Sequence, residues 1–435
     1  MSDHDDPDPD RDRDSDSGDS RADRRAEATA VLASNRRDGY TIPSATLYPF
    51  QWNWDSAFIA VGLAGVDPAA AKAEIETLLS AQWPDGMLPQ IAFWTDAEGY
   101  FPGPDEWDAG TDTVATSGIS QPPVVVPAAR RVAEATGDDA FRDRVLRPLA
   151  EHLSWWRRER STDGVVYTRH PWETGMDDSP AWRPVLERFD PDAVEYERAD
   201  RKSADLAAQR PTDWDYDRYV ALVRQGREAG WDEGRLRERC PFRVEDVLTN
   251  SVFVRACEDL AVLFERSGDA AAAATWRAQA DETRAAMRDR LWSAELGLFV
   301  PYDRVADESL AVPTVAGLLP TYGGVPTDAQ FERLRHTLDE SFLAFDYSAP
   351  TYVGEDLEPD RYWRGPVWAN TNWLLERGLR RYGADATADR IRADSLALLE
   401  REGFREYFNP HTGAGRGSDD FAWSAALYLD WTDEP

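Results

Sequence analysis

The amino-acid sequence predicts an all-α protein, a closed barrel of paired helices that forms one large domain. Three observations favour this fold. Most of the chain after residue 24 places apolar residues at three- and four-residue spacing, as amphipathic helices do. No alternation of strands with helices and no G-x-G-x-x-G or phosphate-loop motif occurs, so nucleotide-binding folds match poorly. Aromatic, turn-rich loops separate the helical stretches at irregular intervals, which fits helical hairpins around an axis better than a short solenoid repeat.

The N-terminal segment differs in composition from the rest of the chain. It begins MSDHDDPDPDRDRDSDSGDS, which contains no aromatic side chain and lacks the apolar core of a signal peptide. Such a charged segment cannot bury enough apolar surface to offset the entropy lost when it becomes ordered. We therefore expect residues 1–24 to be a disordered acidic tail and residues 25–435 to form a single domain.

The helical periodicity predicts the elements of that domain in order. Helices are expected over residues 57–63, 69–79, 124–135, 141–157, 216–228, 244–266, 270–291, 329–338, 367–382 and 386–401. Short extended pieces are expected at 164–167 (GVVY) and 297–302 (GLFVPY), and a turn-rich loop is expected at 84–93.

The chain is strongly acidic, with 81 aspartates and glutamates, 49 lysines and arginines, and a formal net charge of −32. Lysine occurs only at Lys72 and Lys202. This surface charge repels polyanions, so we expect no nucleic-acid partner. The composition is similar to that of haloarchaeal-type proteins, in which concentrated salt screens the repulsion between acidic groups. No apolar run of about 18 residues exists, so no membrane partner is expected.

The two cysteines, Cys240 and Cys257, provide neither a disulfide framework nor a set of metal ligands. Both lie in or beside helical patterns, so we expect buried free thiols. Free thiols fit a reducing compartment, and the predicted location is the cytoplasm.

The 18 tryptophans indicate what the loops bind. Many of them share loops with Asp, Glu, Gln and Arg, and a sugar needs both ring faces for stacking and polar groups for its hydroxyls. The pattern therefore favours a carbohydrate site, with packing in the core or at an interface as the alternative. The loops that stand out are residues 48–58, 116–123, 170–180 and 405–423.

Several polar residues of these loops also have simpler explanations. Asp55 stands at an expected helix start, where Asp is a preferred N-cap. Gln121 precedes two prolines in a stretch that a turn explains. Glu406 alone is typical of a surface carboxylate. The case for chemistry rests on the four loops taken together.

Residues 170–180, HPWETGMDDSP, place three carboxylates among aromatic and turn residues. Paired carboxylates in such loops suggest glycoside hydrolysis, which needs one protonated acid and one ionised base or nucleophile. Trp172 and Met176 supply apolar walls that can keep an acid protonated. Glu173 and Asp178 either raise the pKa of that acid or fix the loop.

Other enzyme classes fit less well. The five histidines show no H-E-x-x-H or other metal-binding spacing, so no metal site and no cofactor is expected. A serine hydrolase would need a G-x-S-x-G elbow, which is absent from the sequence.

Taken in order, the loop motifs resemble glycoside hydrolase family 63. They are YPFQWNWDSAF, SAQWPDGMLPQ, TSGISQPP, HPWETGMDDSP, RPTDWDYDRY, YWRGPVW and EYFNPHTGAG…FAWSAAL, spread over residues 40–430. The resemblance is closest to the mannosylglycerate and glucosylglycerate hydrolases of that family. It implies an (α/α)6 toroid, a six-hairpin barrel with short β pieces in the active-site loops, and an inverting mechanism that needs no metal.

The resemblance also assigns roles to individual residues. The acid would be Asp177 and the base Glu406. The non-reducing sugar would be held by Tyr48, Trp52, Trp54 and Asp55, with Gln121 and Trp172 lining the same pocket. The glycerate group would contact Arg210 and Tyr216, and Tyr362, Trp363 and Trp368 complete the aromatic set.

Two departures concern the leaving-group side of the site. Asn53 stands where an aromatic residue is common in the family, and the charged stretch 186–209 is expected to form a mobile flap near the site. The expected substrate is 2-O-α-mannosyl- or glucosylglycerate, or a similar small α-glycoside. The alternative is a broader α-glucosidase, glycogen-debranching- or trehalase-like hydrolase, while a sugar 2-epimerase and a non-catalytic sugar-binding protein fit the residues less well.

Overall fold

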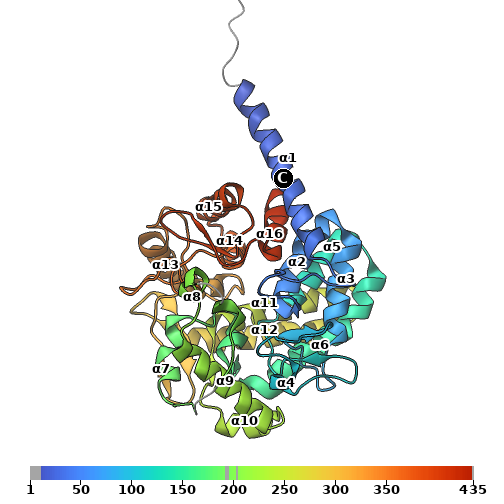
Figure 1. Ribbon diagram of the computed structural model, residues 1–435, viewed down its shortest axis with the longest axis vertical. Helices are drawn as coiled ribbons and strands as arrows, with labels where there is room; N and C mark the ends of the chain where they lie inside the picture. Colours follow the sequence, from blue (N-terminus) through green and yellow to red (C-terminus); the bar gives the residue numbers. More distant parts are fainter. Residues whose placement is uncertain (1–10, 192–194, 202–203, 434–435) are drawn as a thin grey trace, which may run out of the picture.

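The computed structural model describes residues 11–191, 195–201 and 204–433, with side chains left out of the description at 11–20, 199 and 204. Helices dominate it, arranged as two concentric rings (Figure 1). Within these residues, no helix is both long enough and apolar enough to cross a membrane.

The inner ring is closed, because each of its elements packs against the next and the last packs against the first. In ring order the elements are α2 (Asn53–Val66), α5 (Val125–Thr136), α11 (Val247–Arg266), the 3-10 helix η4 (Val315–Thr321), α14 (Ala369–Arg381) and α16 (Ala422–Asp433). Most of their side chains are buried, so these helices form the core of the molecule.

The outer ring packs against the inner ring and has an exposed face. Its helices are α1 (Arg11–Asn35), α3 (Pro68–Ser80), α6 (Asp139–Arg160), α12 (Ala270–Arg290), α13 (Asp328–Thr337) and α15 (Asp385–Glu402). Neighbouring inner and outer helices form hairpins, such as α2 with α3, α11 with α12 and α14 with α15. The (α/α)6 barrel expected from the sequence is therefore the fold of this chain.

Local sequence explains where many of these helices begin. Asp67 accepts a hydrogen bond from the backbone N–H of Ala70 at the start of α3, Asp138 caps α6 in the same way, and Asp269 caps α12. An aspartate at this position satisfies a backbone donor that the first helical turn leaves without a partner. Further helices lie in the connections: the short α4 (Pro104–Trp107), α7 (Arg183–Leu186), α8 (Ala204–Ala208) and α10 (Glu233–Arg239), and the longer α9 (Asp213–Glu228).

The strands are short and lie in the loops, as expected. One sheet joins β1 (Gln51–Trp52), β2 (Ile91–Phe93) and β3 (Ala115–Thr116), and a hairpin joins β11 (Tyr407–Phe408) to β12 (Gly415–Arg416). The others are β4 (Ser161–Thr162), β5 (Val165–Val166), β6 (Val244–Glu245), β7 (Trp292–Ser293), β8 (Leu298–Phe299), β9 (Tyr302–Asp303) and β10 (Glu308–Ser309). The pairings among these strands are antiparallel.

Three sequence-based expectations need correction. Helix α11 begins at Val247 and not at 244, because β6 pairs with β9 and Asp246 then caps the helix. Asp55 is not the N-cap of α2, since that helix begins at Asn53. The inner helix α16, which the periodicity did not indicate, is buried on all sides and so lacks a polar face.

A disordered tail was expected over residues 1–24, whereas in the structure residues 11–24 belong to α1. Arg24 pairs with Glu27, and Arg25 donates to Thr432 Oγ1 at 2.6 Å and to the carbonyl of Leu429 in α16. Figure 1 shows α1 lying beside α16 and extending beyond the barrel. Residues 1–10 lie outside the described part of the chain.

Candidate active site

A pocket of about 980 Å³, solvent at its mouth included, is lined by the loops that lead into the inner helices. The loops before α2, α5, α14 and α16 each contribute side chains, and so does the connection between α6 and α11. Because the inner helices start at the same end of a closed ring, residues far apart in sequence meet there. Every site residue predicted from the sequence lines this pocket.

Glu406 lies immediately before β11 and is completely buried. The hairpin β11–β12 fixes it, because its backbone N–H donates to Ser418 O at 3.0 Å while Ser418 N donates to Glu406 Oε2 at 2.9 Å. Gly417 has a φ of +68°, and a Cβ there would lie 2.3 Å from Glu406 Oε2. The glycine-rich turn is therefore needed to bring the backbone against this carboxylate.

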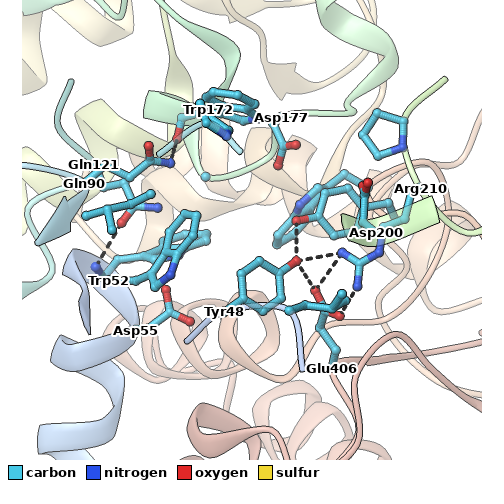
Figure 2. A pocket seen from close by; sticks show the side chains of 18 of the residues that line it. Tyr48, Trp52, Asp55, Gln90, Gln121, Trp172, Asp177, Asp200, Arg210 and Glu406 are labelled. Atoms are coloured by element: carbon cyan, nitrogen blue, oxygen red, sulfur yellow. Dashed lines mark hydrogen bonds and ion pairs between the residues drawn. The ribbon is translucent and has the colours of Figure 1, made fainter. Parts of the chain in front are cut away.

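The remaining contacts of Glu406 come from two distant parts of the chain (Figure 2). Tyr48 Oη donates to Glu406 Oε1 at 2.9 Å and lies 3.3 Å from Tyr362 Oη. The guanidinium of Arg210 binds both carboxylate oxygens, with Nη1 3.1 Å from Oε1, and Nη1 also donates to Tyr48 Oη at 2.7 Å. This is a buried, bidentate ion pair.

Asp177 faces the same pocket from another side (Figure 2). Its loop turns at Gly175, whose φ is +75° and where a Cβ would lie 2.4 Å from the Trp54 ring. Trp182 Nε1 donates to Met176 O and Tyr219 Oη donates to Asp177 O, both at 2.7 Å. Burial raises the pKa of Asp177 well above its usual value, and the nearby Asp178 and Glu406 add to this rise.

The two other carboxylates of this loop have different surroundings. Arg160 binds both oxygens of Glu173, at 2.9 and 3.0 Å, and together with Arg169 it outweighs the effect of burial, so the pKa of Glu173 is lowered. Asp178 pairs with Arg361 through two 2.9 Å contacts, yet burial raises the pKa of Asp178 to about 7. Glu173 thus fixes the loop, while Asp178 both fixes it and raises the pKa of Asp177.

Aromatic rings enclose the rest of the pocket. Trp363 stacks on Trp368 with 3.8 Å between ring centroids, and Trp54 lies 6.2 Å from Trp363. Trp172 contacts Tyr216 edge to face, with 5.7 Å between the ring centroids. Flat apolar rings of this kind can stack on the C–H faces of a sugar.

Two polar residues lie among these rings. Burial, and then repulsion from Glu406, raise the pKa of Asp55 well above its usual value. Gln121 is buried and accepts a hydrogen bond from the backbone N–H of Trp54 at 3.2 Å, so it also holds the start of α2. The pocket therefore combines stacking surfaces, hydroxyl-binding groups and carboxylates of differing acidity.

The sequence comparisons agree with this geometry. Residues 48–424 match the family model of the mannosylglycerate hydrolase MGH1-like glycoside hydrolase domain. The chain belongs to this family. It is therefore a glycosidase, as the carboxylates of its loops indicated.

Related MGH1-like proteins match over nearly the whole chain. A mannosylglycerate hydrolase from Thermus thermophilus is 41% identical over 420 residues, which cover 93% of this chain and 100% of the relative. A glucosylglycerate hydrolase from Mycolicibacterium hassiacum is 34% identical, over 93% of this chain and 97% of the relative. The crystal structure of a GH63 mannosylglycerate hydrolase from Thermus thermophilus with Tris and D-glycerate superimposes with a TM-score of 0.89 at 40% identity, covering 94% of this chain and 100% of that one.

Some residues of this MGH1-like pocket were not singled out from the sequence. Gln90 ends the motif SAQWPDGMLPQ and is buried, and its Oε1 has no hydrogen-bond partner among the described residues. Asp200 belongs to the charged stretch 186–209, where nothing in the composition distinguishes it from its acidic neighbours. Tyr100, Phe101, Trp107 and Trp423 also line the pocket.

The expected flap is described in part. Residues 192–194 and 202–203 lie outside the described chain, and the rest contains η3 (Ala199–Arg201) and α8. Arg198 lies 4.0 Å above the ring of Tyr216 and pairs with Asp200 at 2.8 Å, which places this stretch at the edge of the pocket. Its mobility stays a prediction.

Proposed function

We propose that this glycosidase hydrolyses 2-O-α-mannosyl- or glucosylglycerate with inversion at the anomeric carbon, using Asp177 as the acid and Glu406 as the base. The observation that carries the proposal is that these two carboxylates, far apart in sequence, line one aromatic pocket from different sides (Figure 2). The activities for which the related hydrolases are named, and the D-glycerate bound in the Thermus thermophilus crystal structure, support the choice of substrate.

Asp177 suits the role of proton donor. Its raised pKa favours the protonated carboxyl, which is the form that a general acid requires before the reaction starts. In the proposed step, Asp177 transfers its proton to the glycosidic oxygen while the bond from that oxygen to the sugar breaks. The former glycosidic oxygen then leaves as a hydroxyl group of glycerate and not as an alkoxide.

Glu406 suits the role of base. It accepts a proton from a water molecule whose oxygen attacks the anomeric carbon on the face opposite to the leaving group. The α-glycoside thereby yields a β-sugar. Asp177 ends ionised and Glu406 protonated, so one proton exchange with solvent restores the starting state.

The polar side chains of the pocket suit the two parts of the substrate. Asp55 and Gln121, set among Trp54 and Trp363, are placed to bind hydroxyls of a sugar that stacks on the rings. Arg210 and Tyr216 line the leaving-group side in the proposal, where a guanidinium can bind the carboxylate of glycerate in bidentate fashion.

Amide variants combined with two leaving groups test the assignment of acid and base. Fluoride leaves without protonation, so Asp177→Asn should lose about 10²–10⁴-fold on mannosyl- or glucosylglycerate but much less on the matching α-glycosyl fluoride. Glu406→Gln should lose activity on both substrates, because both need an activated water. Steady-state rates measure these losses.

The exposed carboxylate Glu228 of α9 provides the control. Glu228→Gln should retain wild-type rates on both substrates. Near-wild-type turnover of the glycerate conjugate by Asp177→Asn or Glu406→Gln would refute the assignment.

A further inference from the structure

Glu406 has a full set of hydrogen-bond donors around it. Oε1 accepts from Tyr48 Oη and from Arg210 Nη1, and Oε2 accepts from Arg210 Nη2 and from Ser418 N. An ionised carboxylate has about four lone-pair positions on its two oxygens. The contacts of Glu406 therefore occupy all of them.

This arrangement conflicts with the role of a base. A carboxylate that activates water must offer a lone pair to one of its protons, within hydrogen-bond distance. Of the donors to Glu406, Ser418 N belongs to the backbone that fixes this residue and Tyr48 donates to one oxygen only, while Arg210 occupies one position on each oxygen. Arg210 is thus the contact whose loosening would free Glu406 for water.

Arg210 can exchange partners without losing its place. The preceding Gln209 is attached to the β11–β12 hairpin by its own bonds, with Tyr407 Oη donating to its carbonyl at 2.9 Å and Gly417 N donating to its Oε1 at 3.0 Å. The backbone therefore stays anchored if the guanidinium releases Glu406. Arg210 Nε is buried and has no hydrogen-bond partner among the described residues, so it offers a donor to a second acceptor.

We propose that Arg210 and Glu406 form a latch that the carboxylate of the leaving group opens. This inference rests on the proposed function. A carboxylate entering the pocket binds Nε and Nη2 of the guanidinium and replaces Glu406 as the partner of its positive charge. A lone pair of Glu406 then becomes available to the attacking water. The arginine remains paired throughout, which avoids the high cost of leaving a buried charge unpaired.

The latch makes recognition of the leaving group part of catalysis. A substrate with a carboxylate switches the base on, whereas a neutral α-glycoside of the same sugar binds while Glu406 stays engaged with Arg210. Selection for the carboxylate then acts on kcat and not only on KM, because the interaction is used to reach the transition state.

The unmodified protein tests the latch with a substrate that lacks the leaving-group carboxylate. Hydrolysis of α-mannosyl and α-glucosyl fluoride is measured with increasing D-glycerate, and with glycerol as the neutral control. D-glycerate should raise kcat on the fluoride about tenfold or more and saturably, since a freed general base is worth about 10²–10⁴-fold. Glycerol should have no such effect.

A variant pair separates the latch from other effects of glycerate. Arg210→Lys keeps the charge but cannot form a bidentate pair, so its fluoride hydrolysis should no longer depend on glycerate. The control is Arg416→Lys, because Arg416 lies on the β11–β12 hairpin next to Glu406 and pairs with Asp360 at 2.7 Å. This variant should keep the activation by D-glycerate that the wild type shows.

Three results would overturn the latch. Unchanged or reduced fluoride hydrolysis when D-glycerate is added would show that Arg210 does not hold the base back. Equal activation of wild type and Arg210→Lys would assign the effect to another residue. Absence of fluoride hydrolysis under every condition would refute the proposed glycosidase site itself, and the latch with it.

Discussion

The carboxylates around the pocket share burial and differ in their partners, and this difference separates their roles. Glu173 and Asp178 each have an arginine on both oxygens. Asp177 has two carboxylates among the causes of its raised pKa, which suits an acid. Glu406 is paired with Arg210, and release of this arginine would allow Glu406 to act as the base.

Glu74, behind the pocket, allows a test of how burial affects a single carboxyl. It is completely buried, accepts from Ser56 Oγ at 2.6 Å, and burial raises its pKa to about 7 from an ordinary 4.5. The folded state therefore keeps this proton up to about pH 7, while the unfolded state loses it near pH 4.5. The stability that Glu74 contributes is full below pH 4.5 and is lost as the pH rises to 7.

Glu74→Gln should remove this pH dependence. The difference in unfolding free energy between variant and wild type should shift in favour of the variant by about 3 kcal/mol as the pH rises from about 4.5 to about 7. Denaturant titrations at several pH values, in one fixed salt concentration, give this difference. A difference that is constant with pH would contradict the raised pKa.

Single residues were the part of the site that the sequence predicted best. The pocket is lined by the predicted site residues of the quoted loops, whereas Glu173 and Asp178 of the same loops do not line it. Asp200 and Gln90 were missed, since a charged residue in a charged stretch and an amide after a proline carry no distinguishing pattern. The arginine partner of Glu406 was also out of reach, because the pair depends on tertiary closure.

At the level of elements, the ring depends on close contact between its first and last inner helices. Gly62 of α2 lies so near α16 that a Cβ would be 2.1 Å from the backbone O of Ala426. Helix α2 also carries Trp54 and Asp55 in its first turn. Packing at Gly62 therefore affects both stability and the pocket.

Gly62→Ala should destabilise the protein by about 3 kcal/mol or more, because backbone atoms cannot move aside as a side chain can. Thermal or denaturant unfolding measures the loss. Gly65→Ala is the matched control on the same helix, since its Cβ would meet only the end of the Asp433 side chain. Equal stability of the two variants would contradict the close crossing.

Helical elements were predictable where one face is polar, and less so where burial is complete. The outer helices α3, α6 and α12 have mixed faces, and their periodicity located them within a few residues. Helix α16 is buried throughout and carries no such signal. The start of a helix was predicted wrongly where the residues before it form a strand, as those of β6 do before α11.

At the level of the whole molecule, the net charge of −32 sets the conditions for stability. The sequence predicts an acidic, salt-adapted surface, and self-repulsion of this size opposes compact folding. A single domain over residues 25–435 and a cytoplasmic location also stay predictions. The two free cysteines are buried, as expected.

Salt should therefore stabilise the fold. Between about 0.1 M and about 1 M KCl the Debye length falls from about 10 Å to about 3 Å, so repulsion between surface carboxylates is strongly reduced. The midpoint of thermal unfolding should rise over this range, and activity should rise with it. Full stability and activity in dilute buffer, with no gain from KCl, would contradict the salt-adapted interpretation.

The configuration of the first-formed sugar shows whether Asp177 and Glu406 act together as the acid and base of an inverting hydrolase. Proton NMR of the anomeric signals is recorded within the first turnovers of mannosylglycerate and of glucosylglycerate, before mutarotation mixes the anomers. The β-anomer should appear first, because Glu406 directs water to the face opposite the bond that Asp177 protonates. Initial release of the α-anomer, or no release of sugar from either conjugate, would contradict it.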